Sequence, residues 1–377
     1  MTAPRLLYVV TEDWYFLSHR LPMARAAKAA GYDVHVATRI NRGKEAIEAE
    51  GFTPHSLSWQ RGSLSPTHSL AGVAELRKLL HALKPDILHN ISLKPVLLGG
   101  IASLGLSSIA VVNSLTGLGT LFVGNHRKSE LTRPLVVAAL KALLKRPNVR
   151  TIVQNPDDKR FVLGLGVPEG SVDLIPGSGV DLEHFTPLPE PPPPVTAAYV
   201  GRMLADKGVL TLIEAHSLAT SRGVKLQLLL AGDTDRENPG SLAPEQLREF
   251  ASAFGIRWLG HVADIREVWE RAHVAVLASR REGLPKSLLE AAACGRPMIA
   301  TDTPGCREIA ISGKTALTFP VDDAAALAEA LTQMAGDADM RARFGSAARA
   351  LVEEKFSAEA IGKATVALYQ SLVPSRR

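Results

Sequence analysis

The stretch VAVLASRREGLPKSLLEAAACGRPMIAT, residues 274–301, decides the fold of this chain. It begins with an apolar run, residues 274–277, that predicts a buried strand, and it ends with a second such run, residues 298–301. Between them we expect a helix over residues 285–294, because proline suits a first helical position and glycine suits a helix end. Strand, helix and strand in this order predict a parallel βαβ unit. Its strand-to-helix loop then lies at the sheet edge where open parallel sheets bind ligands.

Two carboxylates stand on either side of this helix start. Glu282 lies in the loop, and Glu290 lies about a turn and a half into the predicted helix. The backbone N–H groups between them form a seat for an anion such as a phosphate, and the carboxylates can accept hydrogen bonds from sugar hydroxyls. The pattern indicates a nucleotide-sugar site. A solvated helix start with two surface glutamates is an equally open interpretation.

A second charged loop follows another predicted strand, residues 197–200. Gly201 lets the chain turn, and Arg202 and Lys207 are five positions apart across the loop, so both can reach one ligand at the strand's carboxyl end. Two cations beside a diphosphate would stabilise charge that develops on a leaving group. Taken alone, the loop fits ordinary solvated charges at least as well.

Strand and helix signals alternate along the whole chain, which predicts an α/β protein with helices on both faces of parallel sheets. The alternation is interrupted by prolines between residues 187 and 194, which neither a strand nor a helix interior tolerates. We therefore expect two doubly wound, Rossmann-like domains that face a central cleft. Their expected limits are 1–185 for the first domain, 186–195 for a stiff hinge, 196–356 for the second domain, and 357–377 for a terminal helix that crosses back to the first domain.

The net charge of +5 is concentrated in one segment. Residues 125–150 contain seven basic residues and one acid, so the rest of the chain is close to neutral. Local basicity argues against a nucleic-acid partner. A basic patch beside an apolar helix suits an anionic inner-membrane surface, whereas Lys145 and Arg146 could equally stabilise the C-terminal dipole of a core helix.

Other features exclude several classes of protein. No apolar run reaches the roughly 20 residues that span a bilayer, and the N-terminus lacks the flanks of a signal peptide. We therefore expect a cytoplasmic protein, and peripheral attachment to the inner membrane is left open. The cysteines and histidines lack metal-site spacing. Asp233 and Asp235 resemble a metal-binding pair, but a turn is the simpler interpretation. We expect no bound metal and no cofactor.

These motifs resemble those of the retaining glycosyltransferases of family 4, which have the two-domain GT-B fold. Glu282 and Glu290 are similar to that family's paired glutamates, and the segment 201–208 is similar to its diphosphate-binding loop. In the first half, the segments 13–22, 90–95, 113–119 and 154–158 resemble bacterial enzymes that extend sugars on undecaprenyl diphosphate.

The resemblance implies transfer from a nucleotide-activated sugar with retention of anomeric configuration. It implies that Glu290 accepts the ribose hydroxyls, that Glu282 approaches the donor sugar, and that Arg202 and Lys207 hold the diphosphate in place of a divalent cation. The remaining donor-binding positions that it implies are Gly201, Gly283, Leu284, Pro285 and Lys286.

The first half departs from the family at two places. Its first strand-to-helix loop lacks the glycine pair of many members, and Asn113 and Ser114 stand where many members carry a histidine. Candidate acceptor or cleft residues are therefore His19, Arg20, Asn113, Ser114 and Thr116.

The resemblance favours a uridine diphosphate donor and a lipid-linked or oligosaccharide acceptor. A nucleotide-sugar 2-epimerase, or a non-catalytic subunit that binds nucleotide sugars, is the alternative. The sequence leaves open the donor sugar, the linkage and the oligomeric state.

Overall fold

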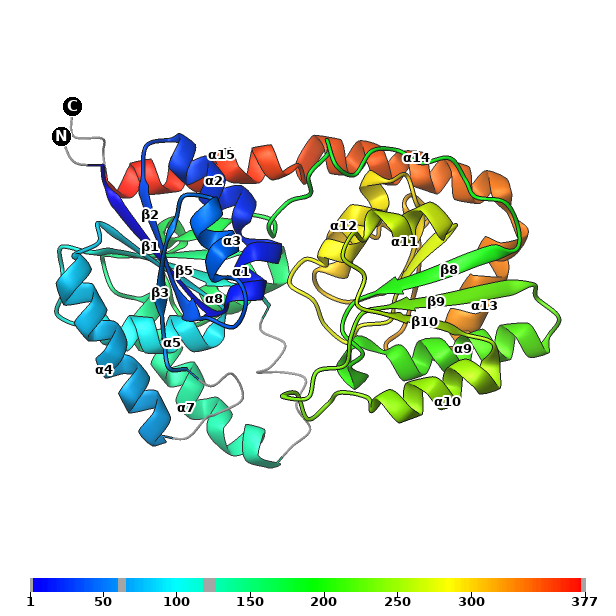
Figure 1. Cartoon of the computed structure of the whole chain (residues 1–377), viewed down its shortest axis with the longest axis horizontal. Coiled ribbons are helices and arrows are strands. Elements are labelled where there is room, and N and C mark those ends of the chain that lie inside the picture. The colour runs from blue at the N-terminus through cyan, green and yellow to red at the C-terminus, as the bar shows by residue number, and fades with distance from the viewer. Residues whose placement is uncertain (1–2, 60–65, 118–126, 374–377) are drawn as a thin grey trace. The chain divides into compact units, whose positions relative to one another are not determined.

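The computed structural model describes residues 3–59, 66–117 and 127–373 (Figure 1). It divides into two compact units. Unit 1 comprises residues 1–178 together with 358–377, and unit 2 comprises residues 179–357. Each unit is described by itself below.

The described residues of unit 1 form a seven-stranded parallel sheet in the order β3-β2-β1-β4-β5-β6-β7. Its strands are β1 (Arg5–Glu12), β2 (Asp33–Arg39), β3 (Thr53–Ser56), β4 (Ile87–Ile91), β5 (Ala110–Leu115), β6 (Val149–Val153) and β7 (Val172–Leu174). Its helices are α1 (Asp13–His19), α2 (Leu21–Ala29), α3 (Lys44–Ala49), α4 (Pro66–Leu83), α5 (Leu93–Ala102), α7 (Arg127–Leu144), α8 (Pro156–Gly164) and α15 (Ala358–Leu372).

Strand β1 shows why this sheet is covered on both faces. Successive side chains of a strand point to opposite faces. Leu6 and Tyr8 accordingly join the core cluster that contains residues of α1, α2 and α15. Leu7 and Val9 join the cluster beneath α4 and α5. A continuous apolar run is therefore the expected sequence of a strand buried between two helical layers.

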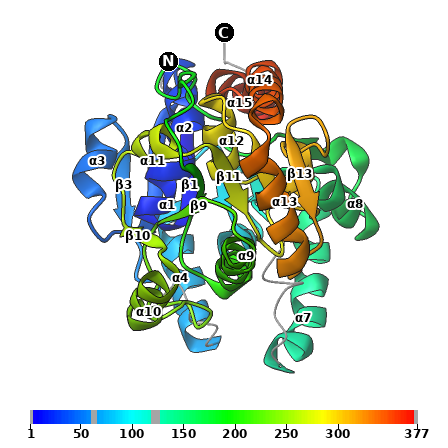
Figure 2. The same ribbon diagram turned by 90° about the vertical axis from the view of Figure 1, so that its right-hand side faces the viewer.

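The described residues of unit 2 form a six-stranded parallel sheet in the order β10-β9-β8-β11-β12-β13. Figures 1 and 2 show its helices on both faces. Its strands are β8 (Val195–Val200), β9 (Leu226–Ala231), β10 (Arg257–Gly260), β11 (Val274–Leu277), β12 (Met298–Thr301) and β13 (Ala316–Phe319). Its helices are α9 (Val209–Ser221), α10 (Pro244–Phe254), α11 (Arg266–Arg271), α12 (Lys286–Ala293), α13 (Ala324–Gly336) and α14 (Ala338–Lys355).

The expected α/β class with two doubly wound parallel sheets is thereby confirmed. The helix of the opening βαβ unit begins at Lys286, one residue later than predicted, and Pro285 has the extended conformation of the residue before a helix. Five elements were missed, namely α1, β3, α11, β13 and α14. Strands β3 and β13 are both edge strands, where apolar patterning is weak, and β3 also contains Pro54. Helix α14 was missed because charged residues dominate its sequence.

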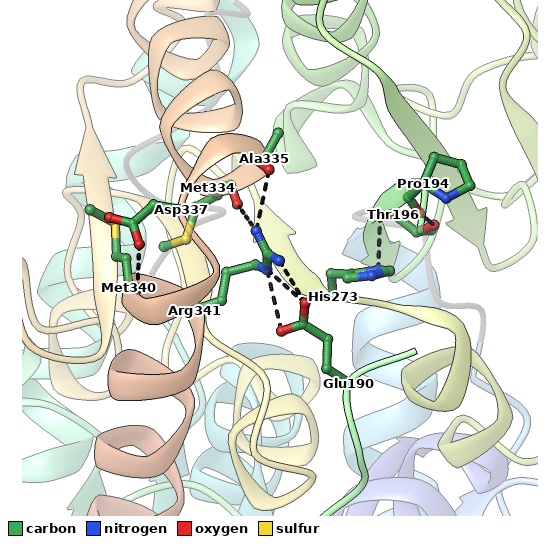
Figure 3. Close-up of polar contacts among 9 residues, drawn as sticks. All are labelled: Glu190, Pro194, Thr196, His273, Met334, Ala335, Asp337, Met340 and Arg341. Carbon is green, nitrogen blue, oxygen red and sulfur yellow. Dashed lines mark hydrogen bonds and ion pairs between the residues drawn. The ribbon is translucent and has the colours of Figure 1, made fainter. Parts of the chain in front are cut away.

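The units divide at Ser178 and Gly179, so the proline-rich stretch 186–195 lies inside unit 2 and is not the expected hinge. Side chains of unit 2 explain why. Arg341 of α14 is 6% exposed and donates from Nη2 to Glu190 Oε1 at 2.6 Å (Figure 3). Its Nη1 donates to the carbonyl of Met334 at the end of α13. Arg296 Nη2 donates to the carbonyl of Pro189 at 2.8 Å, which is a second hydrogen-bonded contact between this stretch and the rest of unit 2.

His273 fixes the far end of the same stretch. Its Nδ1 accepts a hydrogen bond from the backbone N–H of Thr196 at 3.0 Å, and its own backbone N–H donates to the carbonyl of Thr196 (Figure 3). Burial lowers the pKa of His273, so the ring stays neutral and keeps Nδ1 as an acceptor. The prolines therefore run along unit 2 with both ends hydrogen-bonded.

Candidate donor and acceptor sites

In unit 2 the predicted donor residues meet at one edge of the sheet. Strand β8 lies between β9 and β11, and all three run parallel, so their carboxyl ends share this edge. Arg202 and Lys207 follow β8, while Glu282 follows β11. Topology thus brings together residues that are about 75 positions apart in the chain.

Lys207 and Glu282 form a direct ion pair. Lys207 Nζ lies 2.5 Å from Glu282 Oε1. The same oxygen accepts a hydrogen bond from Ser279 Oγ at 2.6 Å, so Glu282 is held from two sides. The pair is partly shielded, with 27% of the lysine and 13% of the glutamate side chain exposed. Such a pair positions a cation and an anion next to each other while leaving both within reach of a ligand.

Two glycines make this close approach possible. Gly208 has a φ of +69°, and a Cβ there would lie 2.0 Å from the carbonyl oxygen of Ala278, at the end of β11. Gly305 has a φ of +80°, and a Cβ there would lie 2.5 Å from the carbonyl oxygens of Glu282 and Gly283. Only glycine combines positive φ with backbone contacts this short. These contacts lock the loops after β8 and β12 against the loop that carries Glu282.

Arg202 has a different carboxylate partner from Lys207. Its Nη1 lies 2.6 Å from Asp235 Oδ2, in the loop after β9. Tyr199 donates from its hydroxyl to the carbonyl of Arg202 at 2.7 Å, which fixes the backbone of the loop. Asp235, expected only as a turn residue, therefore orients an arginine of the candidate site.

Helix α12 carries the second glutamate. Glu290 is 5% exposed, and its Oε1 lies 2.9 Å from Lys286 Nζ, one helical turn earlier. Gly283 and Pro285 are buried, and Leu284 packs against the core of the unit. The first-turn N–H groups of α12 lie between the two glutamates along the chain, as the sequence predicts. The N–H of Leu288 donates to the carbonyl of Pro285, whereas the first two N–H groups of a helix generally have no acceptor within it.

Arg280 braces the same edge. It forms ion pairs with Asp206 at 3.3 Å and with Asp322 at 3.0 Å, and these acids lie in the loops after β8 and β13. Sequence reasoning missed Ser279, Arg280 and the role of Asp235. Their signal was present, since all three follow strands, but only the strand order shows which loops are neighbours.

In unit 1, His19 and Arg20 lie at the carboxyl edge of β1. The His19 ring stacks on Tyr15 with a centroid distance of 4.5 Å, and its Nδ1 lies 2.7 Å from Ser18 Oγ. Arg20 is buried, and its Nη2 donates to the Tyr15 hydroxyl at 3.2 Å. The two predicted residues thus converge on Tyr15, which the sequence did not single out.

The predicted residues of β5 divide into two sets. Asn113 and Ser114 are buried: Asn113 Oδ1 accepts from Asn90 Nδ2, and Ser114 Oγ lies 2.6 Å from His89 Nε2. Thr116, just past the strand, is partly exposed, and its hydroxyl lies 2.9 Å from that of Ser92. Of the three, Thr116 is the one open to a ligand.

The basic segment 125–150 is less exposed than its sequence suggests. Residues 125 and 126 lie outside the described residues, and the side chains of 127–132 are not described. Arg146 turns inward and donates to the carbonyls of Gly100 and Ser103, so it caps α5 and not its own helix. Arg150 pairs with Asp173 at 2.6 Å. The exposed basic side chains of the described part are Arg133, Lys141 and Lys145.

The described residues contain no group of three or more metal-ligating side chains placed to hold an ion. Nor do they contain a helix with the length and apolarity to cross a membrane.

The chain matches the models of two protein families. Residues 5–153 match the model described as "Glycosyl transferase 4-like", and residues 194–337 match that described as "Glycosyl transferases group 1". Together the matches span more than half of the chain. The chain is 26% identical over 348 residues to the N,N'-diacetylbacillosaminyl-diphospho-undecaprenol alpha-1,3-N-acetylgalactosaminyltransferase of Campylobacter jejuni. This alignment covers 86% of this chain and 90% of the relative. It is 23% identical to the capsular polysaccharide biosynthesis glycosyltransferase CapM of Staphylococcus aureus, with 99% of this chain and 98% of the relative covered.

Solved structures share the fold. The sucrose-phosphate synthase of Thermosynechococcus elongatus superposes with a TM-score of 0.80 at 21% identity, covering 98% of this chain and 99% of that one. The Anabaena protein HepE, solved in complex with UDP and glucose, superposes with a TM-score of 0.77 at 18% identity, covering 97% and 99%. These likenesses confirm the expected GT-B architecture.

Proposed function

Because this chain belongs to the family 4-like, group 1 glycosyltransferases of GT-B fold, we propose that it moves a hexose-type sugar from a nucleotide diphosphate sugar to a lipid-diphosphate-linked glycan. The observation that carries the proposal is the Lys207–Glu282 ion pair at the sheet edge, with Arg202 and the start of α12 beside it. Cations, a carboxylate and helix amides at one edge match the parts of a sugar diphosphate.

Each side chain has a role in this proposal. Lys207 and Arg202 hold the diphosphate and neutralise the charge that develops as it leaves, in the place of a divalent cation, so the reaction needs neither metal nor cofactor. Glu282 approaches the donor sugar, and Glu290 accepts the ribose hydroxyls once Lys286 turns toward the phosphates. The donor sugar's bond to phosphate oxygen breaks while the acceptor oxygen bonds to the anomeric carbon on the same face. The acceptor's proton passes to the leaving phosphate, and the configuration is retained.

Uridine diphosphate is the proposed leaving group. It is supported by HepE, which shares the fold and binds UDP. The Campylobacter jejuni relative acts on an undecaprenol-linked diphosphate, which supports a lipid-linked acceptor in polysaccharide or glycan biosynthesis.

The proposed location is the cytoplasmic face of the inner membrane. Arg133, Lys141 and Lys145 are exposed on or just after α7, and Leu135 between them is 72% exposed. An exposed leucine among basic residues suits an anionic lipid surface. Cosedimentation with vesicles of phosphatidylglycerol, against vesicles of phosphatidylcholine, tests this, and equal binding to both or to neither would refute it.

Incubation with a panel of nucleotide sugars, with and without a short-chain polyprenyl diphosphosugar acceptor, tests the function. We expect product only with acceptor present, an α-linkage from an α-linked donor, and unchanged turnover in EDTA. Free UDP should raise the melting temperature more than GDP or ADP, because the true leaving group binds the folded state. Epimerised donor without acceptor would instead establish an epimerase, and nucleotide binding without chemistry would establish a binding subunit.

A further inference from the structure

Within the described part of unit 2, Glu290 is a buried carboxylate with one ion-pair partner. It is 5% exposed and lies in α12 among apolar residues such as Leu289 and Ala291. Its Oε1 lies 2.9 Å from Lys286 Nζ, and this pair is the side-chain contact that the described residues give the carboxylate. An ionised carboxylate can accept about four hydrogen bonds, and burying it without them costs free energy. Glu290 therefore keeps acceptor capacity for the hydroxyl groups of a ligand.

Lys286 carries its charge at an unfavourable end of this helix. It is the first residue of α12, and the N-terminus of a helix has a partial positive charge, which disfavours a cation and favours an anion. The order of the pair is also the weaker one, because a glutamate stabilises a helix better when it precedes the lysine by four residues than when it follows it. Helix stability therefore does not explain a lysine here. What stabilises its charge is a neighbouring anion, and Glu290 supplies it.

The Lys286–Glu290 pair can open without movement of the backbone. Both residues belong to one helix, and a lysine carries its charge on a flexible stem of four carbons. The lysine side chain is 30% exposed, whereas that of Glu290 is 7% exposed. Lys207 and Arg202, by contrast, pair with carboxylates that belong to other loops. Of the three ion pairs, the one within α12 is therefore the one that a ligand opens with the least rearrangement.

An ammonium group that leaves Glu290 remains beside the expected phosphate seat. That seat is the start of α12, whose first amides attract anions. Lys207 approaches it from the loop after β8, since it is paired with Glu282 in the loop that leads into α12. Lysine has three N–H donors and forms charge-assisted contacts with phosphate oxygens. Glu290 and a bound diphosphate therefore compete for the charge of Lys286.

We propose that Lys286 is a specificity-determining residue that couples recognition of the ribose to recognition of the diphosphate. Without nucleotide, its Nζ neutralises Glu290. When a ribonucleoside diphosphate binds, the ribose hydroxyls replace Nζ on Glu290, and Nζ contacts a phosphate oxygen. A nucleoside alone breaks the ion pair and gives Nζ no new partner, and pyrophosphate alone leaves a buried carboxylate unpaired. The inference rests on the proposed function for the identity of the ligand as a nucleotide diphosphate.

Binding of UDP and of uridine to the full chain gives the first test, by calorimetry for UDP and by ligand-observed NMR titration for uridine. In Lys286→Met, UDP should bind about tenfold or more weakly, as loss of one charge-assisted contact predicts. Uridine should bind at least as tightly as to the wild type, because it no longer has to break an ion pair. A purely structural role of Lys286 would weaken both ligands by the same factor. That result, or unchanged binding of UDP, overturns the proposal.

A double cycle of ligand and protein measures the coupling itself. Its second ligand is 2′,3′-dideoxy-UDP, which lacks the hydroxyl groups that replace Nζ on Glu290. With this ligand Lys286 stays paired with Glu290 and contributes little to binding. Lys286→Met should therefore weaken the binding of dideoxy-UDP by less than about threefold, against about tenfold or more for UDP. Equal losses for the two ligands would show that ribose and diphosphate are bound independently, which overturns the coupling.

Lys44→Met is the matched control for both experiments. Lys44 is likewise the first residue of its helix, α3, and it pairs with a glutamate four residues later, but the side chain of that partner, Glu48, is 49% exposed. This variant should bind both ligands as the wild type does, and urea denaturation shows that each variant is folded.

The binding experiments also separate this inference from the proposed function. Where GDP or ADP binds the wild type more tightly than UDP, the same series is run with that nucleotide, its nucleoside and its dideoxy form. A chain that binds the nucleotide with the expected dependence on Lys286 but transfers no sugar refutes only the proposed function. A wild type that binds none of the three nucleotides overturns both.

Discussion

Replacing Lys207 by alanine probes the donor site most directly. The structure places Lys207 Nζ 2.5 Å from Glu282 Oε1, with Ser279 Oγ at 2.6 Å from the same oxygen. Among the described residues, alanine therefore leaves the Ser279 hydroxyl as the hydrogen-bond partner of Glu282. It also removes one preorganised cation from the position where the leaving diphosphate gains charge.

The expected loss of turnover is at least about 100-fold, since one such contact contributes about 3 kcal/mol to transition-state stabilisation. The effect on folding should be much smaller. A partly exposed ion pair contributes about 1 kcal/mol or less to the free energy of unfolding. A large fall in kcat with a nearly unchanged urea midpoint is thus the expected combination.

The assay is steady-state transfer with the donor that the wild type uses, accompanied by urea denaturation. Lys159→Ala is the matched control, because Lys159 is exposed to a similar degree, 30%, and is also ion-paired. A second arm repeats the change in a Glu282→Gln background. If Lys207 only holds Glu282, Lys207→Ala should then cost little; if it binds the diphosphate, the loss persists. A folded Lys207→Ala variant with wild-type turnover would refute the reasoning.

Three other predictions concern the fold around the two sites. Gly208→Ala should lower turnover at least about tenfold and destabilise unit 2 by more than about 1 kcal/mol, because the added Cβ collides with the Ala278 carbonyl. The control is Gly223→Ala, which has positive φ but open space around it, so urea titrations should show only the conformational cost of the substitution. Tyr369→Phe removes hydroxyl contacts to Tyr8 at 3.0 Å and to His89 at 2.6 Å, so the free energy of unfolding should fall by about 1–3 kcal/mol, and an unchanged urea midpoint would contradict this. Burial, aided by the Arg20 charge, lowers the pKa of His89 to about 3, below its unfolded value of about 6.5. The contribution of His89 to the free energy of unfolding is therefore complete above about pH 6.5 and falls as pH drops toward 3, by at most about 1.4 kcal/mol per pH unit. In a His89→Gln variant, the free energy of unfolding should depend less steeply on pH between about pH 7 and pH 5.

Much of the fold could be predicted because its signals are local. The apolar runs of β8 and β11, and the proline and glycine around α12, each determine an element without reference to distant residues. Elements with weak local signals were missed. Edge strand β3 carries Pro54, and α14 buries only one side of a charged helix. The proline-rich stretch was assigned to a hinge because its composition shows stiffness but not its contacts with Arg341 and Arg296.

The candidate site divides in the same way. Arg202, Lys207, Glu282 and Glu290 could be named from motifs because each motif lies within one strand-to-loop segment. Their partners could not. Asp235, Ser279 and Arg280 acquire a role only when β9, β8 and β11 lie side by side.

The sequence by itself determined the two α/β halves, the strand-to-helix loop of residues 274–301 and the charged residues at its start, because these depend on periodicity and turn chemistry over short distances. The tertiary structure alone decided that Lys207 pairs with Glu282 and that Tyr15 stands over a buried Arg20. Strand order and glycine contacts such as that of Gly208 with Ala278 set those distances, and they join segments that the chain keeps far apart.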